Sequence, residues 1–549
     1  RDPELLLPPG RRLAEAEDTL ARRRADLEPE IVAYVEASTS AEQERQAHLR
    51  AEQQRALREK LARSRRFAAV VSVFFLLSVV AGIYAWQQRE AATVAFQEAE
   101  HNYQAAVDQS VGSVRTFVDS YGDGEISNKM MKLLIDQAQK TLGSLPRDSD
   151  EMMAARTELF DVLSTASWSL GDYGEAERFA RAGIAAADAL VKKDPTRVQW
   201  VRLQASGHGR LSDALRRKGD PATAADEARI AIGLCEALLT TRPGDQGAQN
   251  DLIDNFERAG LALSTVGRPK EAADYFQRWI RLAEDLASRH PDNAAWRRSL
   301  ANAHQDLGDA LMQQRNYAEA IRSYGISIAG LEKLRAEDPK NMRYLHKHAI
   351  SQVRLGDVML AEGRHDDALA EFQAANQLAA KLLREEPANF QWHMFLADTH
   401  QRLGEALLES GRFDKAEAEF RTYRELITQA RERRANTATL FGLSNAYQKM
   451  GDVLLAMGDL DSAAAAYLKS LELALNLDRD RPARPEWDKN LAMTHHRLGT
   501  TLRRQGDTAR ARDHFKRCAD VDFNAFAWAP RSRTPPDVTA DCRRQASEL

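Results

Sequence analysis

The sequence predicts an all-α fold in which a single transmembrane helix is followed by a superhelix of about eight helical hairpins, each 48 residues long. Two observations lead to this prediction. A short motif recurs with a fixed period between Gly171 and Ala511, and an uncharged run of twenty residues occupies positions 67–86. A fixed period of this size indicates stacked supersecondary units, each of which buries its apolar face against its neighbours.

The repeated motif is a turn residue followed five residues later by alanine. Seven of the eight turn positions are glycine, and six of the seven steps between them are 48 residues, the other being 47. Glycine accepts the left-handed conformation that ends a helix, so each turn is expected to close the first helix of a hairpin. The eight motifs are Gly171/Ala176, Gly219/Ala224, Gly267/Ala272, Arg315/Ala320, Gly363/Ala368, Gly411/Ala416, Gly458/Ala463 and Gly506/Ala511.

A small residue precedes each turn by seven positions, and in six repeats an aromatic residue follows the alanine by four. These spacings are helical, so each unit is predicted to be two helices of about 30 Å. The small residue allows the helices to approach, and the aromatic ring fills the groove so made. The small residues are Ser164, Ser212, Gly260, Gly308, Gly356, Gly404, Gly451 and Gly499; the aromatic residues are Phe276, Tyr324, Phe372, Phe420, Tyr467 and Phe515, with Ala180 and Ala228 in the first two repeats.

A proline recurs near the end of the second helix, as at Pro195 and Pro339, because proline cannot continue a helix. This order of small residue, alanine, aromatic residue and proline resembles the tetratricopeptide repeat, although the usual unit of 34 residues is lengthened here to 48. The resemblance covers about residues 150–521. It implies a right-handed superhelix whose concave face binds peptides or folded partners.

The same resemblance assigns the partner-binding positions. In tetratricopeptide repeats three positions of the first helix, spaced three and four residues apart, line the concave face. Here they form a polar to acidic stripe that changes from repeat to repeat, as expected for a groove that holds a protein or a basic or polar peptide. The residues predicted to bind the partner are Asn302, Gln305, Asp309, Asp357, Asp398, Gln401, Glu405, Asn445, Gln448 and Asp452.

Two further columns carry charge. Two residues before the small position stand Arg210, Arg258, Arg354, Arg402, Lys449 and Arg497, and one residue after it stand Asp213, Asp309, Asp357, Glu405 and Asp452. One interpretation is a stripe for a charged partner. The other is a ladder of i,i+3 pairs within each helix, such as Arg354–Asp357, each worth about 0.2–0.5 kcal/mol. We favour the second interpretation for the basic column.

Four histidines also fall in register, at His208, His304, His400 and His495. Successive helices pack about 10 Å apart, whereas metal ligands lie about 2 Å from the ion, so we interpret this column as packing residues. We find no catalytic arrangement and no phosphate-binding loop, and predict no cofactor, no metal and no enzyme activity. A net charge of −4 does not favour nucleic-acid binding.

The uncharged run from Phe67 to Trp86 has the length needed to cross a lipid bilayer. Seven Lys or Arg residues lie in 47–66, and only Arg89 lies in 87–106. The positive-inside rule therefore predicts a single-pass inner-membrane protein with a cytoplasmic N-terminus and periplasmic repeats. In that compartment Cys518 and Cys542 would be available to form a disulfide across the C-terminal tail.

The remaining segments are a basic juxtamembrane helix over 41–66, a helical connector over 87–149 and a capping tail over 522–549, expected to be mostly irregular. Residues 1–40 are interpreted as the remnant of a domain upstream of Arg1. The strings at 13–17 (LAEAE) and 34–38 (YVEAS), with the basic helix and the apolar run, resemble the C-terminal part of bacterial STAND-type signalling NTPases. This resemblance implies the sensor half of a signalling protein. The alternatives are the extracytoplasmic half of a receptor Ser/Thr kinase and an envelope-assembly scaffold without a signalling role.

Overall fold

The computed structural model describes residues 10–26, 28–45, 74, 78, 111–112, 128–144, 149–478, 485–521 and 538–549, and every regular element in these ranges is a helix. The chain divides into two units, residues 1–108 and 109–549. In the first unit, α1 (Arg11–Arg23) and the short 3-10 helix η2 (Arg24–Asp26) precede a helix over 29–45, and Leu13 and Val35 are buried.

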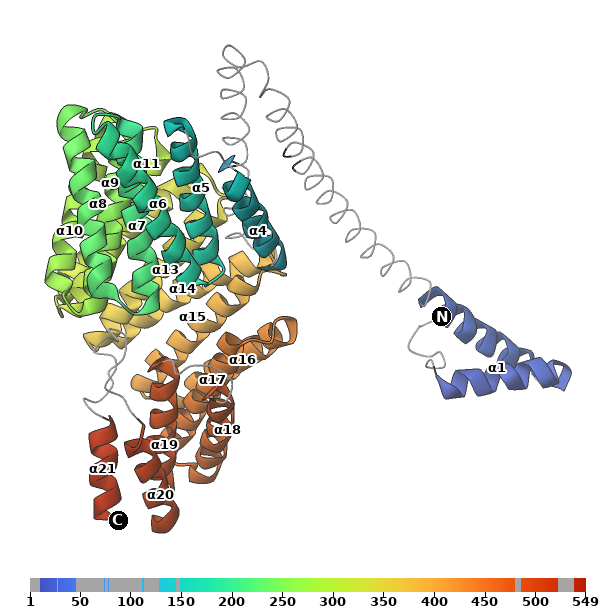
Figure 1. Ribbon diagram of the computed structural model, residues 1–549. Helices are drawn as coiled ribbons and strands as arrows, with labels where there is room; N and C mark the ends of the chain where they lie inside the picture. The colour runs from blue at the N-terminus through green and yellow to red at the C-terminus, as the bar shows by residue number, and fades with distance from the viewer. Residues whose placement is uncertain are drawn as a thin grey trace. The chain divides into compact units, whose positions relative to one another are not determined.

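The second unit is the repeat array, in which consecutive helices pair into eight antiparallel hairpins after a leading helix α4 (Asn128–Ser144) (Figure 1). The eight predicted hairpins are therefore present. They are α5 (Asp150–Ser169) with α6 (Tyr173–Lys193), α7 (Val198–Lys218) with α8 (Pro221–Thr241), α9 (Gln246–Val266) with α10 (Pro269–Arg289), α11 (Ala294–Gln313) with α12 (Tyr317–Glu337), α13 (Met342–Ala361) with α14 (His365–Glu385), α15 (Phe390–Glu409) with α16 (Phe413–Arg433), α17 (Thr437–Met457) with α18 (Leu460–Asp478), and α19 (Pro485–Arg504) with α20 (Thr508–Ala519).

The turn of each hairpin adopts the predicted left-handed conformation. The seven turn glycines have φ between 75° and 96°, and Arg315, which replaces the glycine in the fourth repeat, has φ 59°. The next residue then starts the second helix. Asp220, for example, donates its backbone N–H to the carbonyl of Leu215 at 2.9 Å, while its carboxylate accepts the backbone N–H of Thr223 at 3.2 Å. One residue thus closes the first helix and caps the second.

The two helices of each hairpin are locked by the small residue and the ring facing it. A methyl group added at Gly404 would stand 2.4 Å from the ring of Phe420, so only hydrogen fits there. In the first two repeats the sizes are exchanged, since Ser164 and Ser212 occur where the facing residues are Ala180 and Ala228. The summed volume across the contact is therefore kept, as close packing requires.

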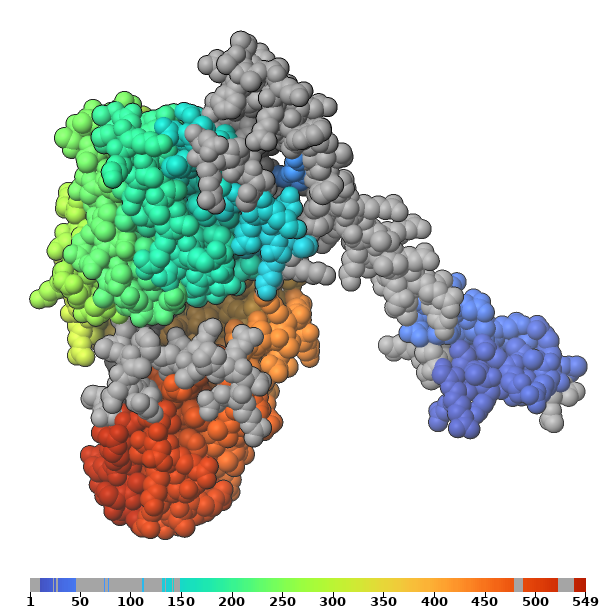
Figure 2. Space-filling view, viewed as in Figure 1, coloured from blue at the N-terminus to red at the C-terminus, as the bar shows by residue number. Residues whose placement is uncertain are grey.

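The array curves with its first helices (α5, α7, α9, α11, α13, α15, α17 and α19) on the inner side. Successive first helices touch each other, as α5 does with α7 and α7 with α9, whereas successive second helices of the described hairpins have no comparable contacts. The concave face therefore consists of first helices. Figure 2 shows the array ending in its orange and red repeats.

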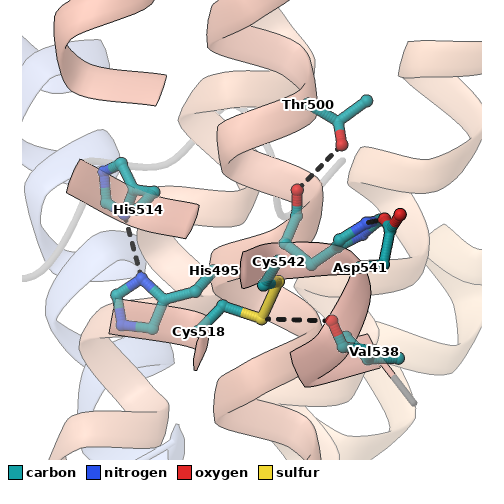
Figure 3. The surroundings of a disulfide bond; sticks show 8 residues. His495, Thr500, His514, Cys518, Val538, Asp541 and Cys542 are labelled. Atoms are coloured by element: carbon teal, nitrogen blue, oxygen red, sulfur yellow. Dashed lines mark hydrogen bonds and ion pairs between the residues drawn. A yellow bond between two sulfur atoms is a disulfide. The ribbon is translucent and has the colours of Figure 1, made fainter. Parts of the chain in front are cut away.

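The C-terminal tail, expected to be irregular, contains a further helix, α21 (Val538–Glu548), which packs against α20 and α19. Cys542 of this helix forms a disulfide with Cys518 of α20 (Figure 3). Val538 joins the apolar core of the last repeat, and His496 forms a 2.8 Å ion pair with Asp541. The tail thus covers the end of the array, as terminal repeats require.

The predicted fold class is wrong in one respect, its transmembrane helix. Among the helices that the structure describes, none has both the length and the apolar character needed to cross a membrane. The segment from Phe67 to Trp86 lies outside the described residues apart from Phe74 and Ser78. A run of twenty uncharged residues met a length criterion, which does not by itself establish a spanning helix. The corrected fold is an all-α repeat superhelix.

The locked contact predicts a difference between two glycine substitutions. We expect Gly404→Ala to lower the free energy of unfolding by about 1–3 kcal/mol, because the added methyl group overlaps the ring of Phe420. Gly325→Ala on α12 is the matched control, since a methyl group there meets nothing within 4 Å. It should be neutral or stabilise by up to about 1 kcal/mol, because alanine favours helices. Urea unfolding followed by circular dichroism measures both, and equal effects would contradict the locked contact.

Candidate partner-binding groove

All ten residues predicted to bind the partner lie on four consecutive first helices. Asn302, Gln305 and Asp309 are on α11, Asp357 is on α13, Asp398, Gln401 and Glu405 are on α15, and Asn445, Gln448 and Asp452 are on α17. Each is buried or half-buried, and none is exposed. They are therefore placed on the elements that form the concave face, but most of their polar atoms are already bonded within the array.

The acidic column pairs with the basic column of the following repeat, and we call this set of contacts the inter-repeat ladder. Each pair joins residues about one repeat apart in the sequence. The described pairs are Asp213–Arg258 at 2.8 Å, Asp309–Arg354 at 3.2 Å, Asp357–Arg402 at 3.5 Å, Glu405–Lys449 at 2.7 Å and Asp452–Arg497. Arg210 at the start of the array pairs with Asp161 at 3.0 Å.

The favoured interpretation of the basic column as i,i+3 pairs is thus wrong for most of its members. Among the described residues only Arg402–Glu405, at 3.4 Å, forms such a pair. The spacing rule considered one helix at a time, whereas stacking brings the next first helix within reach of a long basic side chain. The ladder therefore holds neighbouring repeats together.

Tyrosines of the second helices add to the same carboxylates. The hydroxyl of Tyr324 donates to Asp309 at 2.6 Å, and that of Tyr467 donates to Asp452 at 2.8 Å. Two of the rings that lock a hairpin thereby also bond the ladder. The packing within a repeat and the pairing between repeats are connected through one side chain.

The ladder carboxylates differ in their protonation. Burial acts to raise the pKa of Glu405, but Lys449 and Arg402 outweigh it and lower that pKa to about 2. At Asp357 burial prevails over Arg402 and Arg354 and raises the pKa to about 6. One oxygen of Asp357, Oδ2, is buried without a hydrogen-bond partner among the described residues. Glu405 is therefore fully ionised at neutral pH, whereas Asp357 is only partly compensated.

The amides of the stripe also bond between repeats. Ser351 donates to Gln305 at 3.1 Å, Asn445 donates to Gln401 at 3.0 Å, and Gln448 donates to Thr494 at 2.8 Å. By contrast, Asn302 and Asp398 form no hydrogen bond or ion pair with another described residue. Of the ten predicted residues, these two are the ones whose polar atoms stay available to a ligand.

The ladder is interrupted between α9 and α11. Leu261 stands where other repeats have the acid, and Asp306 stands where they have the base. We call this site, with Asp254 and Glu257 of α9, the ladder gap. Burial, Glu257 and Asp309 raise the pKa of Asp306 well above its usual value, and burial and Asp254 raise that of Glu257. The sequence analysis did not select Asp306 or Glu257, although each charged column lacks a member at this repeat.

The histidine column points toward the second helices. His208 Nδ1 lies 2.6 Å from Glu227, and His400 Nδ1 lies 2.6 Å from Glu419. His495 lies 2.9 Å from His514, and burial lowers its pKa to about 4 (Figure 3). Within the described ranges, no three side chains of metal-ligating type gather at one point.

These features define an all-α repeat protein of the helical-hairpin class. Models of the tetratricopeptide repeat match residues 306–381, 393–422 and 443–522, and the chain contains tetratricopeptide repeats. Among curated proteins none matches this chain.

Several solved structures are similar to it. The apo form of RapI has a TM-score of 0.45 at 11% identity, covering 80% of this chain and 98% of that one. A Rap protein complexed with Competence and Sporulation Factor has a TM-score of 0.41 at 12% identity, covering 74% and 98%. A STAND protein with a tetratricopeptide repeat sensor from Pyrococcus horikoshii has a TM-score of 0.41 at 11% identity, covering 68% and 52%.

The ladder predicts that its buried arginines matter far more than surface ones. The side chains of Arg402 and Asp357 are 13% and 7% exposed. Arg402→Met leaves Asp357 buried beside no cation of the next repeat, and should cost about 3 kcal/mol of unfolding free energy. The control, Arg421→Met, removes an i,i+4 pair with Glu417 in which the arginine is 58% exposed, and should cost less than about 1 kcal/mol.

A second variant tests the cause of this loss. Adding Asp357→Asn to Arg402→Met removes the uncompensated charge and should restore part of the stability, as a double-mutant cycle in urea would measure. A loss at Arg402 no larger than that at Arg421 would show that the ladder does not hold the repeats together.

Proposed function

We propose that the repeat array is a scaffold that binds a protein or peptide ligand on its concave face, as the sensor half of a signalling protein. The observation that supports this proposal is a constant frame with a variable lining. The turn and the small position hardly change, whereas one inner position reads Gln305, Val353 and Gln401 in consecutive repeats. Variation confined to the inner face of a fixed scaffold is typical of a recognition surface.

The distribution of bonds narrows where the ligand is contacted. The inter-repeat ladder uses most of the acidic stripe, so it supports the groove more than it lines a free surface. Asn302 and Asp398 keep their polar atoms available, and they are separated by two repeats along the groove. An extended peptide crossing several first helices would contact both positions through modest hydrogen bonds.

Photo-crosslinking tests this assignment. With p-benzoylphenylalanine at position 302 or 398, we expect covalent adducts with one ligand of constant mass, because both positions face the groove. Ile230 and Ile326, which are 47% and 44% exposed on second helices, are the matched outer positions and should give none. Mass spectrometry after irradiation in the producing cells reads the outcome. Adducts from the outer positions alone would place the binding surface elsewhere.

We further propose that the array functions in an oxidising compartment. The disulfide between Cys518 and Cys542 supports this, since such bonds persist outside reducing cytosol. The remaining thiol, Cys235, is buried, and burial raises its pKa to about 12, so it does not provide a reactive thiolate for exchange.

Thiol counting tests the compartment. Protein taken directly into denaturant and maleimide-polyethylene glycol should gain one adduct, at Cys235, and three only after reduction. Cys542→Ser is the control and should gain two adducts without reduction, because Cys518 is then free. Three adducts on unreduced wild-type protein would contradict the proposal.

A further inference from the structure

We propose that the ladder gap binds a cationic side chain of the ligand, the ammonium of a lysine or the guanidinium of an arginine. This inference rests on the proposed function and deepens it, because it names the chemical class of the ligand and the repeats that recognise it. It concerns Glu257 of α9 and Asp306 of α11 with the polar atoms around them.

The first argument is the exchange of charge at one step of a regular series. At every other described step from Asp213 to Arg497 an acid of one repeat meets a base of its neighbour, directly or across the gap's own flanks. At the gap the acid is replaced by Leu261 and the base by Asp306. A carboxylate therefore stands where the fold elsewhere places a cation, and no basic side chain of the neighbouring repeat takes that place.

The second argument is the charge balance of the groups that face the gap. Helix α9 contributes Asp254, Glu257 and Arg258, helix α11 contributes Asp306 and Asp309, and helix α13 contributes Lys347 and Arg354. Arg258 is bonded to Asp213 at 2.8 Å and Arg354 to Asp309 at 3.2 Å. Lys347 is the one remaining cation of this set, against the three carboxyls of Asp254, Glu257 and Asp306.

The third argument is that nearby buried acceptors lack donors. The Oδ1 atom of Asn302, one turn before Asp306 on α11, is buried without a partner in the described part of the chain. Oδ2 of Asp357 on α13 is likewise unpartnered, and this residue is 8% exposed. Arg354 acts electrostatically on both Asp306 and Asp357, so the two carboxyls share one neighbourhood. Unpartnered acceptors beside uncompensated carboxyls favour a ligand that is both cationic and rich in donors.

The spacing favours a side chain over a metal ion. The carboxyls come from neighbouring helices, which pack about 10 Å apart, and the described residues hold no group of three or more that fits a metal. A flexible lysine or arginine reaches such a site from a peptide backbone lying along the groove. The raised pKa values of Glu257 and Asp306 also fit, since an incoming cation would lower them and release protons.

Fluorescence anisotropy with a fluorescein-labelled hexalysine peptide and the full chain at low ionic strength tests the site. The double variant E257Q/D306N keeps the size of both side chains and should bind the probe at least tenfold more weakly, with unchanged helicity. D274N/E284Q removes the same charge from exposed positions of α10 and should bind as wild type does. A labelled hexaglutamate peptide should not bind.

A third variant supplies the missing pair. L261D/D306R places an acid and a base where the other repeats have them, and should abolish hexalysine binding while raising the urea midpoint. Hexalysine binding by E257Q/D306N at wild-type affinity, or an equal loss in D274N/E284Q, would overturn the assignment of the gap.

The crosslinking experiment separates this inference from the proposed function. If E257Q/D306N still yields adducts from position 302 and hexalysine affinity has not changed, the gap is not the cation site although the groove binds a ligand. If hexalysine binding is lost in that variant while groove positions of the wild type give no adduct in cells, the gap binds cations and the proposed function fails.

Discussion

The contact between a small residue on a first helix and a ring on its second helix is the constraint on which the rest of the array depends. At Gly404 the ring of Phe420 occupies the space in which a methyl group would lie. This contact sets how closely the two helices of a hairpin approach and fixes the tyrosine variants of the ring next to the inner face. From there the hydroxyl groups of Tyr324 and Tyr467 bond the carboxylates of Asp309 and Asp452. Hairpin packing thus positions the groups that join one repeat to the next.

The inner face consequently has two roles that compete for the same side chains. A carboxylate paired with the following repeat contributes to the register of the array, because removing one partner of a buried pair leaves an uncompensated charge. The same carboxylate has little left to offer a ligand. Glu405, with Lys449, Arg402 and Gln401 around it, illustrates a polar residue in a groove whose bonding capacity is already used. Recognition is therefore concentrated at positions where the pairing between repeats is interrupted or never existed.

Much of the fold could be predicted from the sequence, because it depends on short-range periodicity. The left-handed turns, the small-to-ring contact and the eight hairpins all follow from spacings of five, seven and twelve residues within one repeat. The site was less accessible, since the partner of Asp357 is Arg402 in the next repeat, and a rule for a single helix assigned the basic column to the wrong neighbours. Helix α21 was missed because its residues carry no repeat motif, and Asp306 was missed because it is defined by the absence of a pattern.

The inter-repeat ladder also gives the array a direction. Each regular hairpin carries an acid on one side and a base on the other, so a hairpin copied within the gene would fit beside its parent without any further substitution. The hairpins on either side of the gap do not have this property, because a copy of the one containing Asp306 would place that carboxylate against Asp309 of its parent. Growth of the array by duplication is therefore expected in the regular repeats, while the gap stays a single feature at whatever length the array reaches.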